Sequence, residues 1–303
     1  MAIITLDKVS KYYTKRPALG DTSFAVNEGD FFGIAGPKKS GKSTIINLCM
    51  DFIRPTSGVI TVMGQKSWKL STEKKRMIGF MPSNPTYCET MKAIDVIRTA
   101  AKIKGVTDNE QVMRLCKHFN VDRNKRVGSL PLSCRKKIAI VIALMGSPRL
   151  VIMDNCFVAL DKETKNKLAH YLLDLNNKEG VTVVISDRNI DLLQQICTRI
   201  AIMRKGTLLE ISEKEVLLKS DTRRISVKTS DDLSALYNLF RITEVDKDDN
   251  GYISFLYKKD MNSLIGALAT YDLDDLQITL PSLGDALVRF YERQLEQENG
   301  GEN

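Results

Sequence analysis

Short apolar runs separated by turn residues dominate the first 220 residues of this chain. Runs of four to eight apolar, often β-branched residues bounded by Gly, Pro, Asn or Asp are typical of buried strands. They predict strands at residues 3–6, 23–26, 31–35, 59–62, 77–82, 150–154, 181–186 and 200–203. Helical spacing predicts helices at residues 45–50, 162–177 and 190–197. The first two strands favour an antiparallel opening, and the later alternation of strands and helices indicates an α/β domain.

Residues 89–146 carry a different pattern. Leu, Ile, Val and Met recur there at helical spacing, which predicts an all-helical insertion. The apolar run at 150–154 then ends in Asp154, which favours a buried parallel strand with an acid at its carboxyl end. A hairpin through residues 204–207 closes this part of the chain.

The last 83 residues repeat a smaller pattern. Strands are predicted at 225–227, 241–245, 252–256 and 276–278, with helices at 232–239 and 261–270. This βαββαβ order predicts a small α+β, ferredoxin-like domain. A final helix, 282–297, begins at Ser282 as its cap. Residues 1–220 carry a net charge of +15 and residues 221–303 one of −7, which supports two domains, 1–220 and 221–303.

Composition narrows the function classes. The chain has 303 residues, and its longest apolar run, 138–145, is far shorter than the roughly 20 residues of a membrane helix. We expect no secretory signal and no membrane span. Six cysteines without a C-x-x-C pair predict reduced thiols in a cytosol and no zinc site. The basic body suits nucleic acid or an anionic membrane surface, but it lacks a basic stripe interleaved with aromatics, so no nucleic-acid partner is expected.

One stretch carries specific chemistry. It follows the strand at 31–35, precedes the helix at 45–50 and has the pattern G-x-x-x-x-G-K-S, with residues Gly36, Pro37, Lys38, Lys39, Ser40, Gly41, Lys42, Ser43 and Thr44. In this setting the backbone amides and the helix N-terminus cradle phosphate groups. The lysine is expected to reach the β- and γ-phosphates and the serine hydroxyl to bind Mg²⁺. The sequence therefore predicts binding of a nucleoside triphosphate.

The phosphate loop, the helical insertion, the strand ending in Asp154 and the segment 158–161 together resemble the ATP-binding cassette of ABC transporters. The resemblance covers residues 1 to about 218, and the tail looks like the C-terminal domain of bacterial export-type (ABC-2) cassettes. It implies an α/β P-loop NTPase fold, in which a mixed sheet with a RecA-like core is joined by an antiparallel subdomain and the helical insertion.

Roles carry over from the resemblance residue by residue. Tyr13 matches the aromatic that stacks on adenine, with its neighbour Tyr12 as the alternative. Asp154 matches the Walker B acid that helps to hold Mg²⁺, and Asp161 lies in the D-loop. The implied cofactors are ATP and Mg²⁺.

Four positions depart from the family pattern. Asn155 stands at the catalytic glutamate, Arg188 at the switch histidine and Ser83 at the Q-loop glutamine. The signature Leu-Ser-Gly-Gly-Gln is replaced by Leu130, Pro131, Leu132, Ser133 and Cys134. The amide of Asn155 cannot act as a general base. In the signature, Pro131 lacks a backbone amide donor, and residues larger than glycine block the close approach of the backbone to a phosphate. We therefore expect ATP binding with weak hydrolysis.

The resulting hypothesis is the ATP-binding subunit of a membrane transporter, most consistent with an exporter. It would lie in the cytoplasm at the inner face of the membrane, with a separate transmembrane permease and a second cassette, in a homodimer or heterodimer, as partners. The alternative is a regulatory or structural pseudo-ATPase that clamps a partner without hydrolysis. A translation-factor type of cassette is disfavoured because such chains carry two cassettes.

Overall fold

The computed structural model describes residues 1–14, 17–213, 223–242, 245–248, 250–258 and 260–279. The chain divides into two compact units, residues 1–213 and 214–303. The expected boundary at residue 220 and the expected helix 282–297 lie outside the described residues. Within the described residues, no helix combines the length and the apolar character needed to cross a membrane.

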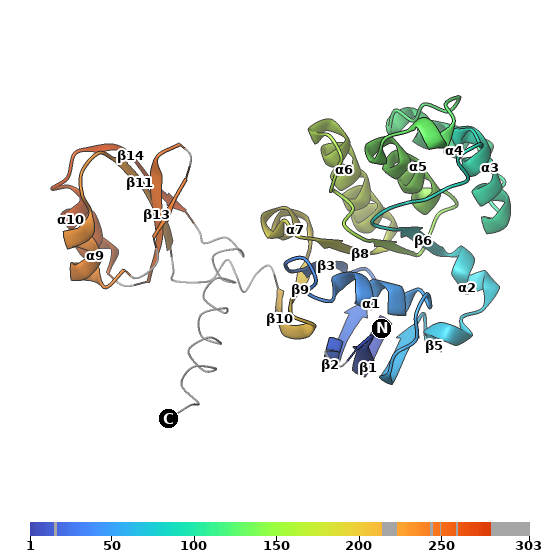
Figure 1. The fold of residues 1–303 in the computed structure, drawn as a ribbon, viewed down its shortest axis with the longest axis horizontal. Helices are drawn as coiled ribbons and strands as arrows, with labels where there is room; N and C mark the ends of the chain where they lie inside the picture. The colour runs from blue at the N-terminus through green and yellow to red at the C-terminus, as the bar shows by residue number, and fades with distance from the viewer. Residues whose placement is uncertain (15–16, 214–222, 243–244, 249, 259, 280–303) are drawn as a thin grey trace. The chain divides into compact units, whose positions relative to one another are not determined.

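A six-stranded sheet forms the centre of the larger unit (Figure 1). Its order is β10-β9-β3-β8-β7-β6, and all neighbouring pairs are parallel except the β9–β10 hairpin. The strands are β3 (Phe31–Ala35), β6 (Ile78–Met81), β7 (Leu150–Met153), β8 (Thr182–Asp187), β9 (Arg199–Arg204) and β10 (Thr207–Glu213). The predicted strands in this region and the predicted hairpin are confirmed.

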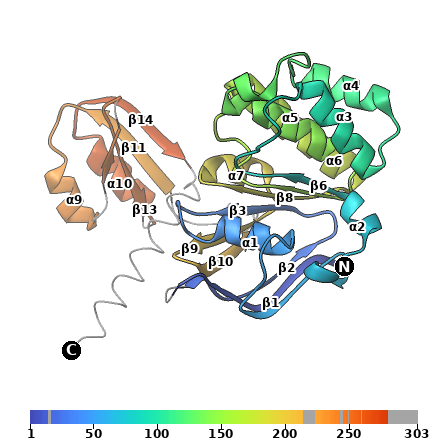
Figure 2. The same cartoon turned by 45° about the vertical axis from the view of Figure 1, so that its right-hand side comes forward.

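A second, antiparallel sheet has the order β2-β1-β4-β5. Its strands are β1 (Ala2–Tyr12), β2 (Pro17–Asn27), β4 (Ser57–Val62) and β5 (Gln65–Lys66). The predicted antiparallel opening is confirmed, although β1 and β2 are longer than the apolar runs that predicted them. Figure 2 shows α1 (Lys42–Cys49) between this sheet and the six-stranded one. Side chains of α1 and of both sheets share one core cluster.

The remaining helices of the larger unit lie mostly over the other face of the six-stranded sheet (Figures 1 and 2). Between β6 and β7 the chain forms α3 (Ala93–Lys104), α4 (Asn109–His118), a 3₁₀ turn (Val127–Ser129) and α5 (Leu132–Leu144). Helices α6 (Lys162–Glu179) and α7 (Ile190–Ile196) follow β7 and β8. The sequence pattern assigned no element to a short 3₁₀ turn (Ser67–Lys69) or to α2 (Thr72–Arg76).

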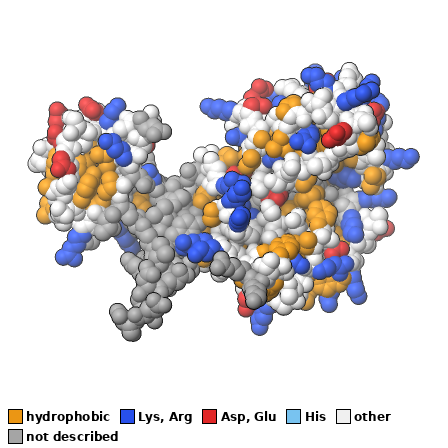
Figure 3. Space-filling model, in the orientation of Figure 1, with side chains coloured by type: hydrophobic (Ala, Val, Ile, Leu, Met, Phe, Trp, Pro, Cys, Tyr) orange, Lys and Arg blue, Asp and Glu red, His pale blue; other side chains and the backbone are white. Residues whose placement is uncertain are grey.

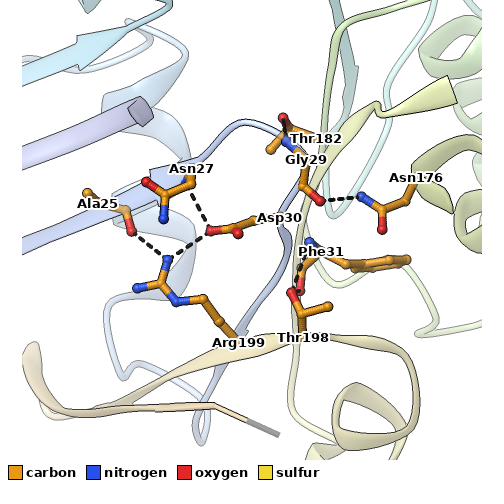
Figure 4. A network of polar contacts seen from close by, with 9 residues as sticks. All are labelled: Ala25, Asn27, Gly29, Asp30, Phe31, Asn176, Thr182, Thr198 and Arg199. Atoms are coloured by element: carbon orange, nitrogen blue, oxygen red, sulfur yellow. Dashed lines mark hydrogen bonds and ion pairs between the residues drawn. The ribbon is translucent and has the colours of Figure 1, made fainter. Parts of the chain in front are cut away.

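A polar network fixes the start of β3, the strand that leads into the phosphate loop (Figure 4). Arg199 Nη1 donates to Asp30 Oδ2 at 2.8 Å and to the Ala25 carbonyl at 3.2 Å. The Asn176 amide donates to the Gly29 carbonyl at 2.8 Å. Hydrogen bonds thereby connect β2, α6 and β9 to the turn before β3. Buried polar groups of this kind stabilise the fold only when each has its hydrogen-bond partner.

The smaller unit is a four-stranded antiparallel sheet with the order β12-β13-β11-β14. Its elements are β11 (Arg223–Thr229), α9 (Ser234–Phe240), β12 (Asp246–Lys247), β13 (Tyr252–Tyr257), α10 (Met261–Leu268) and β14 (Leu273–Thr279). Both the βαββαβ order and the strand order are those of a ferredoxin-like domain. The strand predicted at 241–245 is wrong at residues 241, 242 and 245, and residues 243–244 lie outside the described residues. Arg241, at φ 53°, ends α9 in the left-handed conformation, and β12 begins at Asp246.

Gly79 in β6 lies directly under α5. A Cβ atom at this position would lie 2.1 Å from the Ala143 carbonyl oxygen. We expect Gly79→Ala to lower the free energy of unfolding by about 1–3 kcal/mol, because the helix must move away from the sheet. The single tryptophan, Trp68, lies in the larger unit together with Gly79. Urea unfolding followed by Trp68 fluorescence therefore measures the change in the free energy of unfolding.

Gly20 in β2 provides the matched control, because a Cβ atom there meets nothing closer than 4.0 Å. Gly20→Ala should change the stability by no more than about 0.5 kcal/mol. Equal stabilities of the two variants would contradict the close packing of α5 on β6.

Candidate functional site

The phosphate loop runs between β3 and α1, as the sequence predicts. Two of its positions require glycine. Gly36 has φ 150°, and a Cβ atom there would lie 2.2 Å from the Met203 carbonyl oxygen. Gly41 has φ 105° and precedes the first residue of α1. The loop can therefore turn tightly against β9 and deliver the chain into the helix with its free amides at the helix N-terminus.

The Lys42 ammonium lies inside the curve of the loop. Its Nζ donates to the Gly36 carbonyl at 2.7 Å, the Pro37 carbonyl at 2.8 Å and the Ser40 hydroxyl at 3.3 Å. Burial lowers the pKa of Lys42, and the nearby Arg188 lowers it further, whereas Asp154 and Asp187 raise it. The side chain is thus held at the phosphate loop with a positive neighbour on the β8 side.

A pocket of about 350 Å³ opens over this loop. Its lining residues are Ala18, Lys38, Lys39, Ser40, Gly41, Lys42, Ser43, Thr44, Asn155 and Arg188. The structure therefore brings most of the predicted phosphate loop together with two residues predicted from the ends of β7 and β8. Gly36 and Pro37 shape the loop without lining the pocket. Ala18 was not predicted, and an alanine offers no chemical signal by which it could have been found.

The turn after β7 carries the catalytic-glutamate position. Asn155 has φ 47°, and its Nδ2 donates to Ser83 Oγ at 3.0 Å and to Asp154 Oδ1 at 3.3 Å. Ser186 Oγ donates to the same Asp154 oxygen at 2.5 Å. The Asn155 Oδ1 atom is buried without a hydrogen-bond partner. The structure thus places Ser83, Asp154 and Asn155 in one hydrogen-bonded group.

Two buried charged residues of this region were missed at the sequence level. Lys136 in α5 is fully buried, and its Nζ donates to the Asn155 carbonyl at 2.6 Å. Burial lowers the pKa of Lys136. Asp187, at the end of β8, accepts hydrogen bonds from the backbone amides of Arg188 and Asn189 at 2.8 and 2.9 Å. These two residues hold the turns that carry Asn155 and Arg188. Asp187 directly precedes Arg188, the predicted switch position, and this was a signal for its place, whereas nothing in the helical pattern marked Lys136 as buried.

Other predicted residues lie apart from the pocket lining. Tyr13 is exposed, and Lys11 Nζ lies 5.3 Å from its ring centroid. Residues 130–134, at the signature position, form the start of α5 with Pro131 as its N-cap. Asp161 caps α6 by accepting from the Thr164 amide at 2.7 Å, and it lies 3.4 Å from Lys137 Nζ. The residues at the predicted signature and D-loop positions therefore lie at the starts of α5 and α6.

The oxygen atoms near the pocket decide whether Mg²⁺ fits this site. Mg²⁺ prefers near-octahedral oxygen ligands, with one or two carboxylates and substrate phosphates. Ser43 lines the pocket, but Asp154 does not, and one of its oxygens already accepts two hydrogen bonds. The Ser83 hydroxyl is engaged by Asn155. Within the described ranges, no group of three or more His, Cys, Asp or Glu side chains could hold a metal. The pocket lining, which offers hydroxyl groups but no carboxylate, is therefore a poor fit to magnesium.

Comparison with known proteins identifies the kind of domain. Residues 19–158 match the family model described as "ABC transporter". A solved structure, the dimeric ATP-binding cassette MJ0796 bound to ADP and Pi, superposes with a TM-score of 0.64 at 25% identity, covering 70% of this chain and 98% of that one. The larger unit therefore has the P-loop NTPase fold of ATP-binding cassettes. More narrowly, residues 19–158 are similar to the nucleotide-binding domains of ABC transporters.

Curated relatives extend this result. The "Methionine import ATP-binding protein MetN 1" of Listeria monocytogenes is 29% identical over 222 residues, 69% of this chain and 65% of the relative. The chain thus spans about two thirds of the length of this relative. The "Uncharacterized ABC transporter ATP-binding protein YhcH" of Bacillus subtilis is 25% identical over 290 residues, 93% of this chain and 94% of the relative.

The cap of α6 generates a stability prediction. Asp161→Ala removes the side-chain acceptor of the Thr164 amide, so the free energy of unfolding at neutral pH should fall by about 1 kcal/mol. The hydrogen bonds from Thr164 lower the pKa of Asp161 from 3.8 to about 2. Because the folded pKa is depressed, the carboxylate stabilises the fold above pH 3.8, and this stabilisation is lost as the pH falls toward 2.

The difference in stability between the wild type and Asp161→Ala should therefore shrink as the pH falls below 4, measured by urea unfolding at Trp68. Asp21→Ala is the control, since Asp21 is an exposed carboxylate on β2. A difference that stays constant from pH 7 to pH 2.5 would contradict a cap made by the ionised group.

Proposed function

We propose that this chain is the ATP-binding subunit of a membrane transporter, coupling ATP binding to a separate transmembrane permease. The observation that carries the proposal is the pocket over the phosphate loop, where the N-terminus of α1, Lys42 and Arg188 converge. A pocket built from loop amides and cations recognises the triphosphate of a nucleotide. The protein would act at the inner face of the membrane, where its permease lies.

Each residue of the loop has a distinct part in this proposal. The amides of residues 38–44 and the positive end of α1 receive the phosphate oxygens. Lys42, now bonded to the Gly36 and Pro37 carbonyls, supplies a charged donor that the β- and γ-phosphates would attract. Tyr13, exposed at the end of β1, is available for stacking on the base.

Hydrolysis by this chain is proposed to be weak. Asn155 presents an amide, and its Nδ2 already donates to Ser83 and Asp154, so it cannot take a proton from water. Arg188 brings a permanent positive charge where the family pattern has a histidine. Loss of a general base alone lowers the rate by about 10²–10⁴-fold. Binding, rather than turnover, is therefore the proposed output of this site.

Pairing with a second cassette follows from the same reasoning. In the family, each ATP lies between the phosphate loop of one subunit and the signature of the other. In a homodimer both sites would combine Asn155 with a signature altered at residues 131–134. A heterodimer with an intact cassette would keep a catalytic base at one of its two sites. We therefore propose a heterodimer as the arrangement that hydrolyses ATP.

Export is the proposed direction of transport, and it rests on the likeness of residues 221–303 to the tail of export-type cassettes. The MetN 1 relative is named for methionine import, but its alignment covers 69% of this chain. YhcH aligns over 93% and carries no stated direction. Methionine uptake by cells that depends on this chain and on Lys42 would overturn export. Efflux from cells that depends on the same residue would support it.

A regulatory pseudo-ATPase is the second candidate. The specific observation in its favour is the neutral Asn155 locked between Ser83 and Asp154. In that role the chain would hold a partner closed while ATP is bound. Turnover separates the two candidates, because a transporter subunit hydrolyses ATP with its partner cassette and a pseudo-ATPase does not.

The decisive experiment pairs binding with turnover on the purified chain. Titration with a fluorescent ATP analogue should show saturable binding, and Lys42→Ala should weaken it by at least about tenfold, since a charge-assisted contact is removed. ATP turnover should be very low in the wild type. Asn155→Glu should raise it by about tenfold or more, which is part of the general-base contribution.

Asn155→Gln is the matched control, because it lengthens the side chain without adding a base, and it should leave turnover low. Two results would contradict the proposal. Binding that is insensitive to Lys42→Ala would place the nucleotide elsewhere. Wild-type turnover equal to that of an ordinary transporter ATPase and abolished by Lys42→Ala would show that another residue supplies the base.

A further inference from the structure

The pocket over the phosphate loop is unusually rich in cations. Four of its lining residues are positively charged, namely Lys38, Lys39, Lys42 and Arg188, and no carboxylate lines it. Lys38, Lys39 and Arg188 are exposed, and in the part of the chain that the structure describes none of them forms an ion pair. These charges are therefore available to an anionic ligand, because no existing ion pair has to be broken before the ligand binds.

One carboxylate oxygen of each of the two acids nearest this pocket accepts hydrogen bonds from other partners. Asp154 is buried, and its Oδ1 accepts from Ser186 and Asn155. Asp187 is buried, and its Oδ1 accepts from the two amides that follow it. The group that stands where a metal-binding glutamine is expected, Ser83, is engaged by Asn155. The pocket thus combines a surplus of fixed positive charge with a shortage of oxygen ligands for a divalent cation.

Arg188 is the cation best placed to act on the terminal phosphates. It lines the pocket together with Ser43 and Thr44, and its charge is felt by Lys42. Asp187 holds the turn on which it stands, through hydrogen bonds to the amides of Arg188 and Asn189. A guanidinium in such a place can bind two phosphate oxygens at once.

We propose that this pocket binds its nucleoside triphosphate as the metal-free polyanion, with Arg188, Lys38 and Lys39 neutralising the charge that Mg²⁺ would otherwise neutralise. The inference rests on the proposed function, because it concerns the same nucleotide in the same pocket. It makes nucleotide binding by this chain independent of the supply of divalent cations. It also accounts jointly for the added cations and for the serine that stands at residue 83 in place of the Q-loop glutamine.

The test is a titration of the full chain with a fluorescent ATP analogue in two buffers of equal ionic strength, one with millimolar Mg²⁺ and one with EDTA. The wild-type Kd should agree between the two buffers within about threefold. Arg188→Gln should weaken binding in EDTA by about tenfold or more, the size of one lost charge-assisted contact. Arg188→Lys, which keeps the charge, should retain most of the affinity in EDTA.

Arg98→Gln is the matched control, because Arg98 is an exposed arginine on α3 outside the pocket, and its Kd should equal that of the wild type in both buffers. A wild-type Kd about 30-fold or more weaker in EDTA than in Mg²⁺ would overturn the inference while leaving the proposed function standing. Equal effects of Arg188→Gln and Arg98→Gln in EDTA would also overturn it. Absence of Lys42-dependent binding in both buffers would instead refute the proposed function itself.

Discussion

The burial of α1 between two sheets is the packing constraint on which the rest of the cassette depends. Ile45, Ile46 and Leu48 join residues of both sheets in one core cluster, and each is at most 1% exposed. Full burial of side chains of this size contributes about 1.5–3 kcal/mol each. Because the apolar side of α1 is buried, its N-terminus is held in a fixed position. The phosphate loop leads directly into this N-terminus, so the position of α1 fixes the geometry of the loop. The contact of Gly36 with the Met203 carbonyl then sets the other end of the loop.

Most of the fold of the larger unit could be predicted from the sequence because its strands are buried on both faces. Runs such as Leu150–Met153 and Phe31–Ala35 are apolar at every position, and only a central parallel strand needs that pattern. The order of the strands in the sheet could not be predicted from hydrophobic periodicity, because it depends on which strands become neighbours after long crossover connections. α2, with no buried residue, left no hydrophobic pattern at all. Its cap, Ser71, accepts from the Lys74 amide and was the one local signal available.

The site was predictable to the extent that its chemistry depends on local order in the chain. The phosphate loop follows from residues 36–44 alone, because strand, glycines and helix are consecutive. Asn155 and Arg188 were assigned to the nucleotide site only through the resemblance to a family. In the structure both residues line the pocket over the phosphate loop. Lys136 shows the limit of the approach. A lysine within a helix is usually a solvated charge, and only tertiary packing, with a hydrogen bond to the Asn155 carbonyl, makes Lys136 a buried support of the site.

Charge balance links the neutral Asn155 to the cations around it. A carboxylate at residue 155 would stand beside Asp154, whose Oδ1 lies 3.3 Å from the Asn155 amide nitrogen, and like charges so close raise each other's pKa. A neutral amide removes that repulsion and instead donates a hydrogen bond to Asp154. With this acid lost and Arg188 present, the pocket carries a fixed positive field that attracts a triphosphate but offers no base to a water molecule. The same residues from which weak hydrolysis is proposed therefore strengthen the electrostatic basis for binding, which is the balance expected of a cassette whose output is the bound state.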